Sequence, residues 1–437
     1  MRFRSNHSVI RVPTSRIVLA LILLLLVVSS GIAPAYGWVL SEDEFEERST
    51  EVGLLFRSFG FAFIGPTLAP PYSLSDANPS ASGIFDLRLS FRHRTPNLKI
   101  VVESQLTNTI RSHGDPVGAN LGTGVPALRW LPLQYSSDEP TLGFRVGLDW
   151  IYLAYSFKDI TITVGRQPIT LGRGKIWHPI DLVSSFSLTE VDTEYKPGSD
   201  AIRFDWAVAE RSNLLLVAAV GELDDDHDAE VELRGSAFLC RFQQGLGDGE
   251  FALSLGYIRR DWVVALDGVY DLKHFDLAAE VTLTIPRDKS LTPNSDAPAV
   301  VEALLSATFK PHSRFTLITE VYYNGFGSFD REEYFALFSS ERFSIGEMSS
   351  IGKLYAGVVG SWEAHALLTV NTMVLANLAD PSGLLSISLN YSVSGNVDAI
   401  LGGYIPIGRV PNLKTFIPRS EFGLYPYFVF AEVKVAL

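Results

Sequence analysis

Residues 84–92 read Ile-Phe-Asp-Leu-Arg-Leu-Ser-Phe-Arg, so apolar and polar side chains alternate along the whole stretch. In an extended strand one face of this stretch is apolar, and the other face carries Asp86, Arg88, Ser90 and Arg92. The same period of two recurs at residues 144–152, 202–208, 275–283 and 385–391. The pattern predicts many strands with one apolar and one wet face. Alternation alone leaves open a soluble β-sandwich and a transmembrane barrel.

The N-terminal segment predicts export from the cytoplasm. It carries four arginines and no acidic residue, then an apolar run at 17–28 and a small-residue stretch at 31–35. We interpret residues 1–35 as a signal peptide, because the apolar run is shorter than the ~20 residues of a spanning helix. Residues 36–51 form an acidic N-terminal segment, and 52–437 are expected to form one β-domain.

Composition narrows the class of protein further. The chain is 47% hydrophobic, yet beyond the leader it has no uninterrupted apolar stretch of ~18 residues, so helical membrane spans are excluded. Cys240 is the single cysteine, so an internal disulfide is excluded. Without the four leader arginines, 32 basic residues face 49 acidic ones, a net charge of −17. Nucleic-acid binding is therefore not expected.

The lengths of the connections separate the two β classes. Outer-membrane barrels alternate short periplasmic turns with longer external loops. Eight short connections alternate with longer segments, and only 259–261 breaks the order. This indicates an all-β, antiparallel up-and-down transmembrane barrel of about eighteen strands, with sixteen as the alternative. The eighteen candidates are 52–63, 84–92, 98–106, 143–153, 159–166, 200–208, 213–221, 233–242, 251–259, 262–271, 274–285, 300–310, 315–323, 352–361, 365–375, 384–393, 397–405 and 424–436.

The last candidate strand has an apolar face of alternate residues from Tyr425 to Leu437. Barrel proteins commonly end on such a strand, which the barrel-assembly machinery recognises, although a terminal aromatic is more usual than Leu437. We therefore expect that machinery and outer-membrane lipid as partners. The expected location is the outer membrane of a Gram-negative bacterium, and an assembly of identical barrels is left open.

Residues 164–181, VGRQPITLGRGKIWHPID, are followed at 195–203 by YKPGSDAIR. This region resembles a segment of porin-like outer-membrane proteins, including the alginate-export type of channel. In those proteins a strand ends in Gly-Arg-Gln, a glycine-containing loop follows, and the next strand opens after Gly-x-Asp-Ala. The resemblance implies an outer-membrane channel. It does not imply alginate as the cargo, because the wet faces here mix both signs of charge.

The long connection at 167–199 is the main candidate for a constriction loop, since a loop early in a barrel can fold inward and narrow the pore. A structural lid over the barrel mouth is the alternative. Gly172 and Gly174 suggest a phosphate-binding loop, but the Gly-Lys-Ser/Thr of a P-loop is absent. The ionic groups that could set a local field are Arg166, Arg173, Lys175, His178, Asp181, Glu190, Asp192 and Glu194.

Charged residues on the wet faces should point into the lumen, because a charge facing lipid at the midplane is costly. Many of them are expected to pair across strands and brace the wall rather than select solutes. The candidates for the lumen wall are Arg88, Arg92, Arg145, Asp149, Arg203, Asp205, Asp276 and Glu280.

No catalytic or metal-binding signature accompanies these charges. Gly-x-Ser-x-Gly and His-Glu-x-x-His are absent, and the eight histidines lack metal-ligand spacing. We therefore expect a channel for passive diffusion of small hydrophilic solutes or ions, without enzymatic activity, metal or cofactor. The alternatives are a substrate-specific uptake or export pore for a carbohydrate or organic anion, and a plugged structural barrel.

Overall fold

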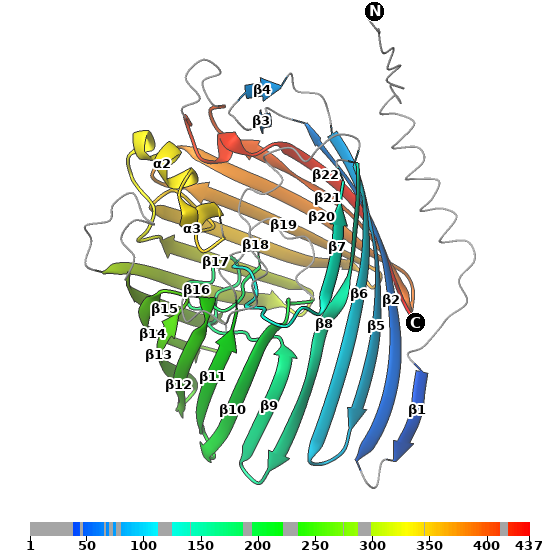
Figure 1. The fold of residues 1–437 in the computed structure, drawn as a ribbon. Helices are drawn as coiled ribbons and strands as arrows, with labels where there is room; N and C mark the ends of the chain where they lie inside the picture. The colour runs from blue at the N-terminus through cyan, green and yellow to red at the C-terminus, as the bar shows by residue number, and fades with distance from the viewer. Residues whose placement is uncertain are drawn as a thin grey trace, which may run out of the picture.

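The protein is a closed antiparallel β-barrel (Figure 1). The computed structural model describes residues 38–43, 47–64, 67–69, 73–75, 80–111, 125–139, 141–186, 195–221, 235–273, 275–286, 299–344, 346–410 and 418–437. Eighteen of the described strands form the wall, and the ring closes where β2 (Arg48–Ile64) pairs with both β5 (Ser80–Arg94) and β22 (Tyr427–Ala436). Closure leaves the wall with no unpaired strand edge, which a bilayer would not tolerate.

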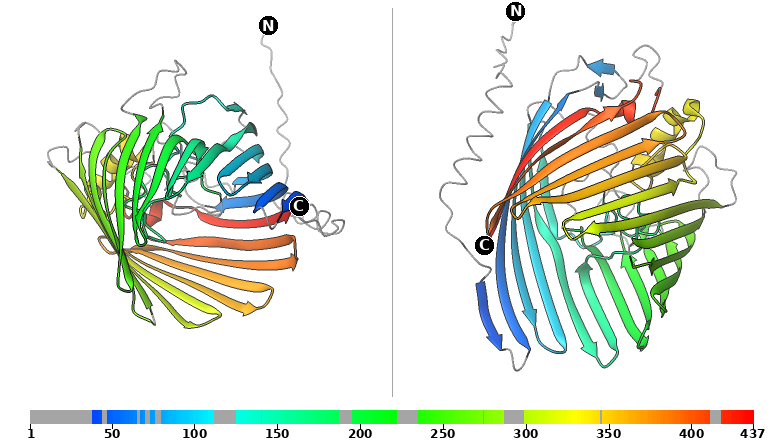
Figure 2. Two further views of the ribbon diagram at one scale, coloured as in Figure 1. Left: turned by 90° about the horizontal axis from the view of Figure 1, so that it is seen from below. Right: turned by 180° about the vertical axis from the view of Figure 1, so that it is seen from behind.

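The other barrel strands follow one another around the ring in chain order, each paired with its neighbours (Figure 2). They are β6 (Leu98–Arg111), β8 (Leu142–Phe157), β9 (Ile160–Gln167), β10 (Ser199–Ala209), β11 (Ser212–Val220), β12 (Ala237–Leu246), β13 (Gly249–Ile258), β14 (Asp261–Asp271), β15 (Phe275–Ile285), β16 (Val300–His312), β17 (Phe315–Tyr323), β18 (Leu354–His365), β19 (Leu368–Asn377), β20 (Ser382–Ser394) and β21 (Val397–Ile407).

The predicted barrel and its eighteen strands are confirmed, since each candidate strand overlaps one observed barrel strand. All eight predicted short connections are found between the corresponding strands, and several are visible at the lower rim in Figure 1. One of them is displaced: the connection expected at 362–364 lies at 366–367, because β18 continues to residue 365. The expectation that 259–261 is the sole short connection on the other side is wrong. Residues 378–381 alone join β19 to β20, where Ser382 donates its backbone N–H to the carbonyl of Asp380 over 2.7 Å.

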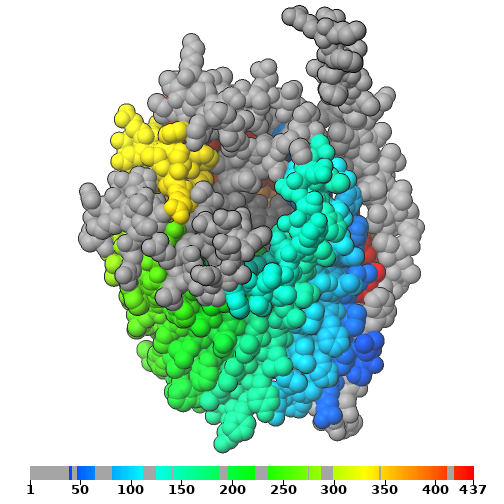
Figure 3. Space-filling view, viewed as in Figure 1, coloured from blue at the N-terminus to red at the C-terminus, as the bar shows by residue number. Residues whose placement is uncertain are grey.

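Each wall strand separates a packed inner face from an exposed apolar outer face. In β14, Val263, Ala265 and Asp267 are buried, whereas Trp262 and Leu266 are 50% and 57% exposed. Large exposed apolar side chains recur on the outside of most wall strands, as a surface in contact with lipid acyl chains requires. Figure 3 shows the outside of this wall as one continuous surface whose colour runs from blue to green in chain order.

A β-bulge in β8 shifts the phase of the alternation. The register with β6 slips between Glu103 and Ser104, which pair with Trp150 and Leu148. Asp149 and Trp150 therefore both turn inward, and the indole of Trp150 donates to the carbonyl of Lys196 over 2.9 Å. The expectation that Trp150 shares one apolar face with residues 144, 146 and 148 is wrong, because one extra residue moves all later side chains to the opposite face.

Several short elements lie outside the ring. β1 (Trp38–Asp43) pairs with the beginning of β2, and β7 (Gln134–Asp138) pairs with β8 above the end of β9. The rim also carries the β3–β4 hairpin (Thr67–Ala69 and Ser73–Ser75) and four short helices: η4 (Arg331–Glu333), α2 (Tyr334–Phe338), α3 (Glu341–Ser344) and η5 (Phe422–Leu424). None of the described helices is long and apolar enough to cross a membrane. The expected signal peptide at 1–35 lies outside the described residues.

Candidate functional site

The connection between β9 and β10 folds into the barrel. We call residues 168–198 the lumen loop; its described parts are 168–186 and 195–198. Ile169, Leu171, Ile180 and Val183 are buried in one apolar cluster with inner-face residues of β10 to β14, such as Val217. The loop is thus packed against the inside of the wall rather than standing above it.

A buried ion pair fixes the two ends of the lumen loop. The guanidinium of Arg166 donates to both carboxylate oxygens of Asp200, over 2.7 and 2.9 Å, and also to the carbonyl of Leu131 over 2.7 Å. Asp200 accepts the backbone N–H groups of Trp130 and Leu131 as well. Arg166 is 1% exposed, so its charge is compensated inside the wall and does not face water.

A second ion pair braces the loop from within. The ammonium of Lys196 lies 2.5 Å from the Asp181 carboxylate, which also accepts the backbone N–H of Leu171. Burial raises the pKa of Asp181 to about 6, against the opposing effect of Lys196. Burial and the positive charges of Lys196 and Lys175 lower the pKa of His178 to about 4. His178 is therefore neutral at physiological pH.

The tip of the lumen loop reaches across to the wall formed by β13 to β18. Backbone N–H groups of residues 173–177 donate to the carboxylates of Glu280 on β15 and Glu320 on β17. The guanidinium of Arg173 contacts Glu250 and, over 3.2 Å, Asp267. These contacts place the predicted loop residue Arg173 beside the predicted wall residue Glu280.

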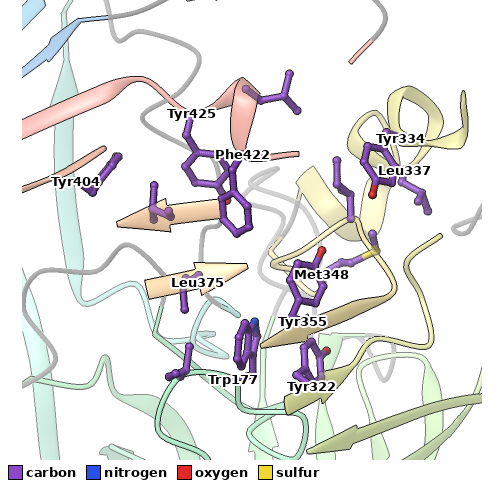
Figure 4. Close-up of a cluster of buried hydrophobic side chains, with 14 of the residues drawn as sticks. Trp177, Tyr322, Tyr334, Leu337, Met348, Tyr355, Leu375, Tyr404, Phe422 and Tyr425 are labelled. Atoms are coloured by element: carbon purple, nitrogen blue, oxygen red, sulfur yellow. The ribbon is translucent and has the colours of Figure 1, made fainter. Parts of the chain in front are cut away.

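Beyond the tip, aromatic side chains join three connections into one cluster (Figure 4). The ring of Trp177 stacks on Tyr322 of β17 at 5.5 Å and lies 5.7 Å from Tyr355 of β18. Tyr334 and Met348 come from the connection that carries α2 and α3, and further residues come from the segment around η5. The cluster fills the barrel on the side of β16 to β21.

An open part of the lumen lies on the opposite side. A cavity of about 520 Å³ is bounded by the lumen loop, by residues 125–129 and by the inner faces of β2, β5, β6 and β8. Its charged lining contains four arginines and two aspartates: Arg57, Arg88, Arg129, Arg145, Asp86 and Asp149. The excess of positive charge makes this cavity favourable for a small anion.

Three of these arginines are paired. Arg57 lies 2.7 Å from Asp86, Arg129 lies 2.5 Å from Asp149, and Arg88 bridges both aspartates at 3.2 and 3.3 Å. Arg88 also lies over the ring of Tyr195 in the lumen loop, 4.4 Å from its centroid. Arg145 is exposed and forms no ion pair with the described acidic residues. Arg145 therefore contributes the least compensated charge in the cavity.

The other predicted residues lie apart from this cavity. Arg92 is exposed on β5, the Arg203–Asp205 pair on β10 closes at 2.7 Å, and Asp276 is half-buried on β15. The Lys175 side chain is exposed on the loop tip. The remaining predicted loop residues, Glu190, Asp192 and Glu194, lie outside the described residues.

Sequence reasoning missed Arg57, Arg129 and Glu250. Arg57 is the one charged residue in the largely apolar stretch 52–64 of β2, and such a charge is a signal for an inward position. Glu250 is the second residue of β13, directly after a short turn, and no charge pattern around it indicates a partner in the lumen. Arg129 lies in a connection without periodicity, so no signal was available.

No family model matches the sequence, and no curated protein matches it. Several solved outer-membrane porins have similar structures. A BenF-like porin from Pseudomonas fluorescens Pf-5 is 12% identical, with a TM-score of 0.52 over 89% of this chain and 98% of that one. OpdK from Pseudomonas aeruginosa, solved with vanillate, is 10% identical (TM-score 0.50; 89% and 98%), and OccAB3 from Acinetobacter baumannii is 12% identical (0.50; 89% and 99%). The chain shares the fold of these porins.

Proposed function

We propose that this protein is a passive channel in the outer membrane of a Gram-negative bacterium, with the lumen loop as its constriction. One observation carries the proposal: a closed barrel with an apolar outside encloses a charged cavity of about 520 Å³ beside an inward-folded loop. A cavity with ionic side chains holds water, and its charges select solutes as they diffuse down a gradient. Such transport needs neither a cofactor nor catalysis.

Reconstitution in planar bilayers tests this proposal. The purified barrel should give discrete conductance steps, and heat-modifiable migration on a gel should show that it is folded. A folded barrel that gives no conductance at any voltage would instead support the plugged structural barrel.

The second candidate function is a substrate-specific pore for an organic anion. The four arginines against two aspartates in the cavity favour it, since guanidinium groups bind carboxylates in a bidentate way. The OpdK structure contains vanillate, which is a carboxylate, and an oligouronate is a second class of carboxylate that the arginines could bind. Saturable block of the conductance by an aromatic carboxylate or by an oligouronate distinguishes the two, and no block by either leaves a general diffusion pore.

The proposed location has its own test. Since short turns face the periplasm in outer-membrane barrels, cysteines at Asn97, Ser313 and Asn396 should resist an impermeant thiol reagent on intact cells, whereas a cysteine at the exposed Asp330 should react. Cys240 is exposed on the barrel and is replaced by serine first.

We also expect the barrel-assembly machinery to insert the chain into the outer membrane. Cross-linking in the same cells tests whether several copies of the barrel assemble into an oligomer.

A further inference from the structure

We infer that Glu280 and Glu320 are the positioning residues of the constriction, because they hold the lumen loop against the wall by its backbone. The inference rests on the proposed channel function and names the groups that set its pore. Glu280 lies on β15 and Glu320 on β17, with β16 between them, and each side chain is 1% exposed.

Five consecutive backbone N–H groups of the loop point at these two carboxylates. Those of Arg173 and Gly174 donate to Oε1 of Glu280, the second over 2.7 Å. The N–H of Lys175 donates to Oε1 of Glu320 over 2.7 Å, and those of residues 176 and 177 donate to its Oε2 over 3.0 and 3.2 Å. Successive N–H groups that converge in this way form an anion-binding concavity.

The two glycines of the tip allow the chain to wrap around the carboxylates. Gly172 has a φ of +84°, and a Cβ there would lie 2.8 Å from Oε1 of Glu280. A Cβ on Gly174 would lie 1.9 Å from the carbonyl oxygen of Trp177. The Gly-Arg-Gly sequence, which suggests a phosphate site, therefore lies at an anion-binding tip. The anions that this tip binds are the carboxylates of Glu280 and Glu320 in the barrel wall.

Acidic side chains near Glu280 form further ion pairs with the docked loop. Glu250 and Asp267 on the neighbouring strands engage the guanidinium of Arg173, and Asp267 also receives two contacts from Arg241. If the loop left the wall, five backbone N–H groups and the two carboxylates would lose their hydrogen bonds together. The loop should therefore leave the wall as a unit or not at all.

A separate steric feature completes the docking site. Gly357 on β18 faces the tip, where a Cβ would lie 2.6 Å from Cδ1 of Ile176 and 2.9 Å from Cζ3 of Trp177. A larger residue at position 357 would push the tip away without changing any charge. Docking of the lumen loop can thus be weakened in two ways: by removing the charges of Glu280 and Glu320, or by adding a side chain at Gly357.

The test compares a double variant, Glu280→Gln with Glu320→Gln, with Gly357→Leu. Glutamine keeps the shape but loses the charge and presents an amide donor to the loop. Both changes should release the tip, and single-channel conductance should roughly double and become noisy in each. Glu432→Gln is the matched control, because it removes a buried carboxylate from β22, which pairs with β2 and β21. It should conduct like the wild type.

Hydrogen–deuterium exchange over residues 171–180 provides a readout independent of conductance. The amides of 173–177 should be protected in the wild type and exchange faster in the double variant and in Gly357→Leu. Folded double variants with wild-type conductance and wild-type exchange would overturn the inference. A wild type that is protected but does not conduct would refute the channel while leaving the positioning role intact.

Discussion

Replacing Arg145 by glutamine tests the proposed path through the cavity. Arg57, Arg88 and Arg129 are paired with two aspartates, so Arg145 supplies one of the two net positive charges of the lining. At about 5 Å in water, a unit charge stabilises a monovalent anion by ~0.8 kcal/mol, from ~332/(80 × 5). Because ~1.4 kcal/mol corresponds to a tenfold ratio, the local anion concentration should fall about fourfold in Arg145→Gln.

The reversal potential across a potassium chloride gradient measures this change. The preference for chloride should decrease at about 0.01 M salt, where the Debye length is about 30 Å, and the difference should vanish near 1 M, where it is about 3 Å. Arg203→Gln is the control, because Arg203 pairs with Asp205 on β10 and does not line the cavity. A folded Arg145→Gln channel with unchanged selectivity at low salt, or an equal shift in Arg203→Gln, would refute the path.

Three further predictions concern the lumen loop. Replacing residues 170–193 by a short glycine-serine linker should raise single-channel conductance and weaken ion selectivity; unchanged values would place the loop outside the conduction path. Asp200→Ala leaves the buried Arg166 charge unpaired, so the free energy of unfolding in urea should fall by ~3–5 kcal/mol, and an unchanged midpoint contradicts this role. Burial lowers the pKa of His178 from about 6.5 to about 4, so its contribution to loop docking is complete above pH ~6.5 and is lost as the pH falls through ~4. Acid should therefore make the wild-type channel noisier than His178→Gln, and identical pH profiles would exclude His178.

The strands of the wall could be predicted because a barrel in a bilayer obeys two local rules. Side chains alternate between lipid and lumen, as in residues 84–92, and short turns alternate with long connections. The rule fails at Trp150, because a bulge adds one residue to β8 without a sequence signal. It fails also at 378–381: the candidate strands leave eight residues, 376–383, for this connection, but β19 and β20 extend into that stretch and leave four.

The inward fold of the lumen loop was anticipated from its position and length, but its contacts were not. The Arg166–Asp200 pair and the Asp181–Lys196 pair show that two predicted loop charges are used to hold the loop in place. Charge type and spacing do not reveal whether an ionic group meets water or a partner. That depends on which strands face one another across the lumen.

The amino-acid sequence by itself determined the closed antiparallel barrel and which residues of most strands turn inward, because these follow from hydrophobic periodicity and connection length between neighbours in the chain. Only the tertiary structure decided where the lumen is open. Glu280 and Glu320 accept hydrogen bonds from backbone N–H groups that precede them by more than 100 residues, and Arg57 and Arg129 line the same cavity. Such contacts arise when the ring closes and brings together residues that are far apart in the chain. The local sequence around each residue does not indicate which partner it will contact.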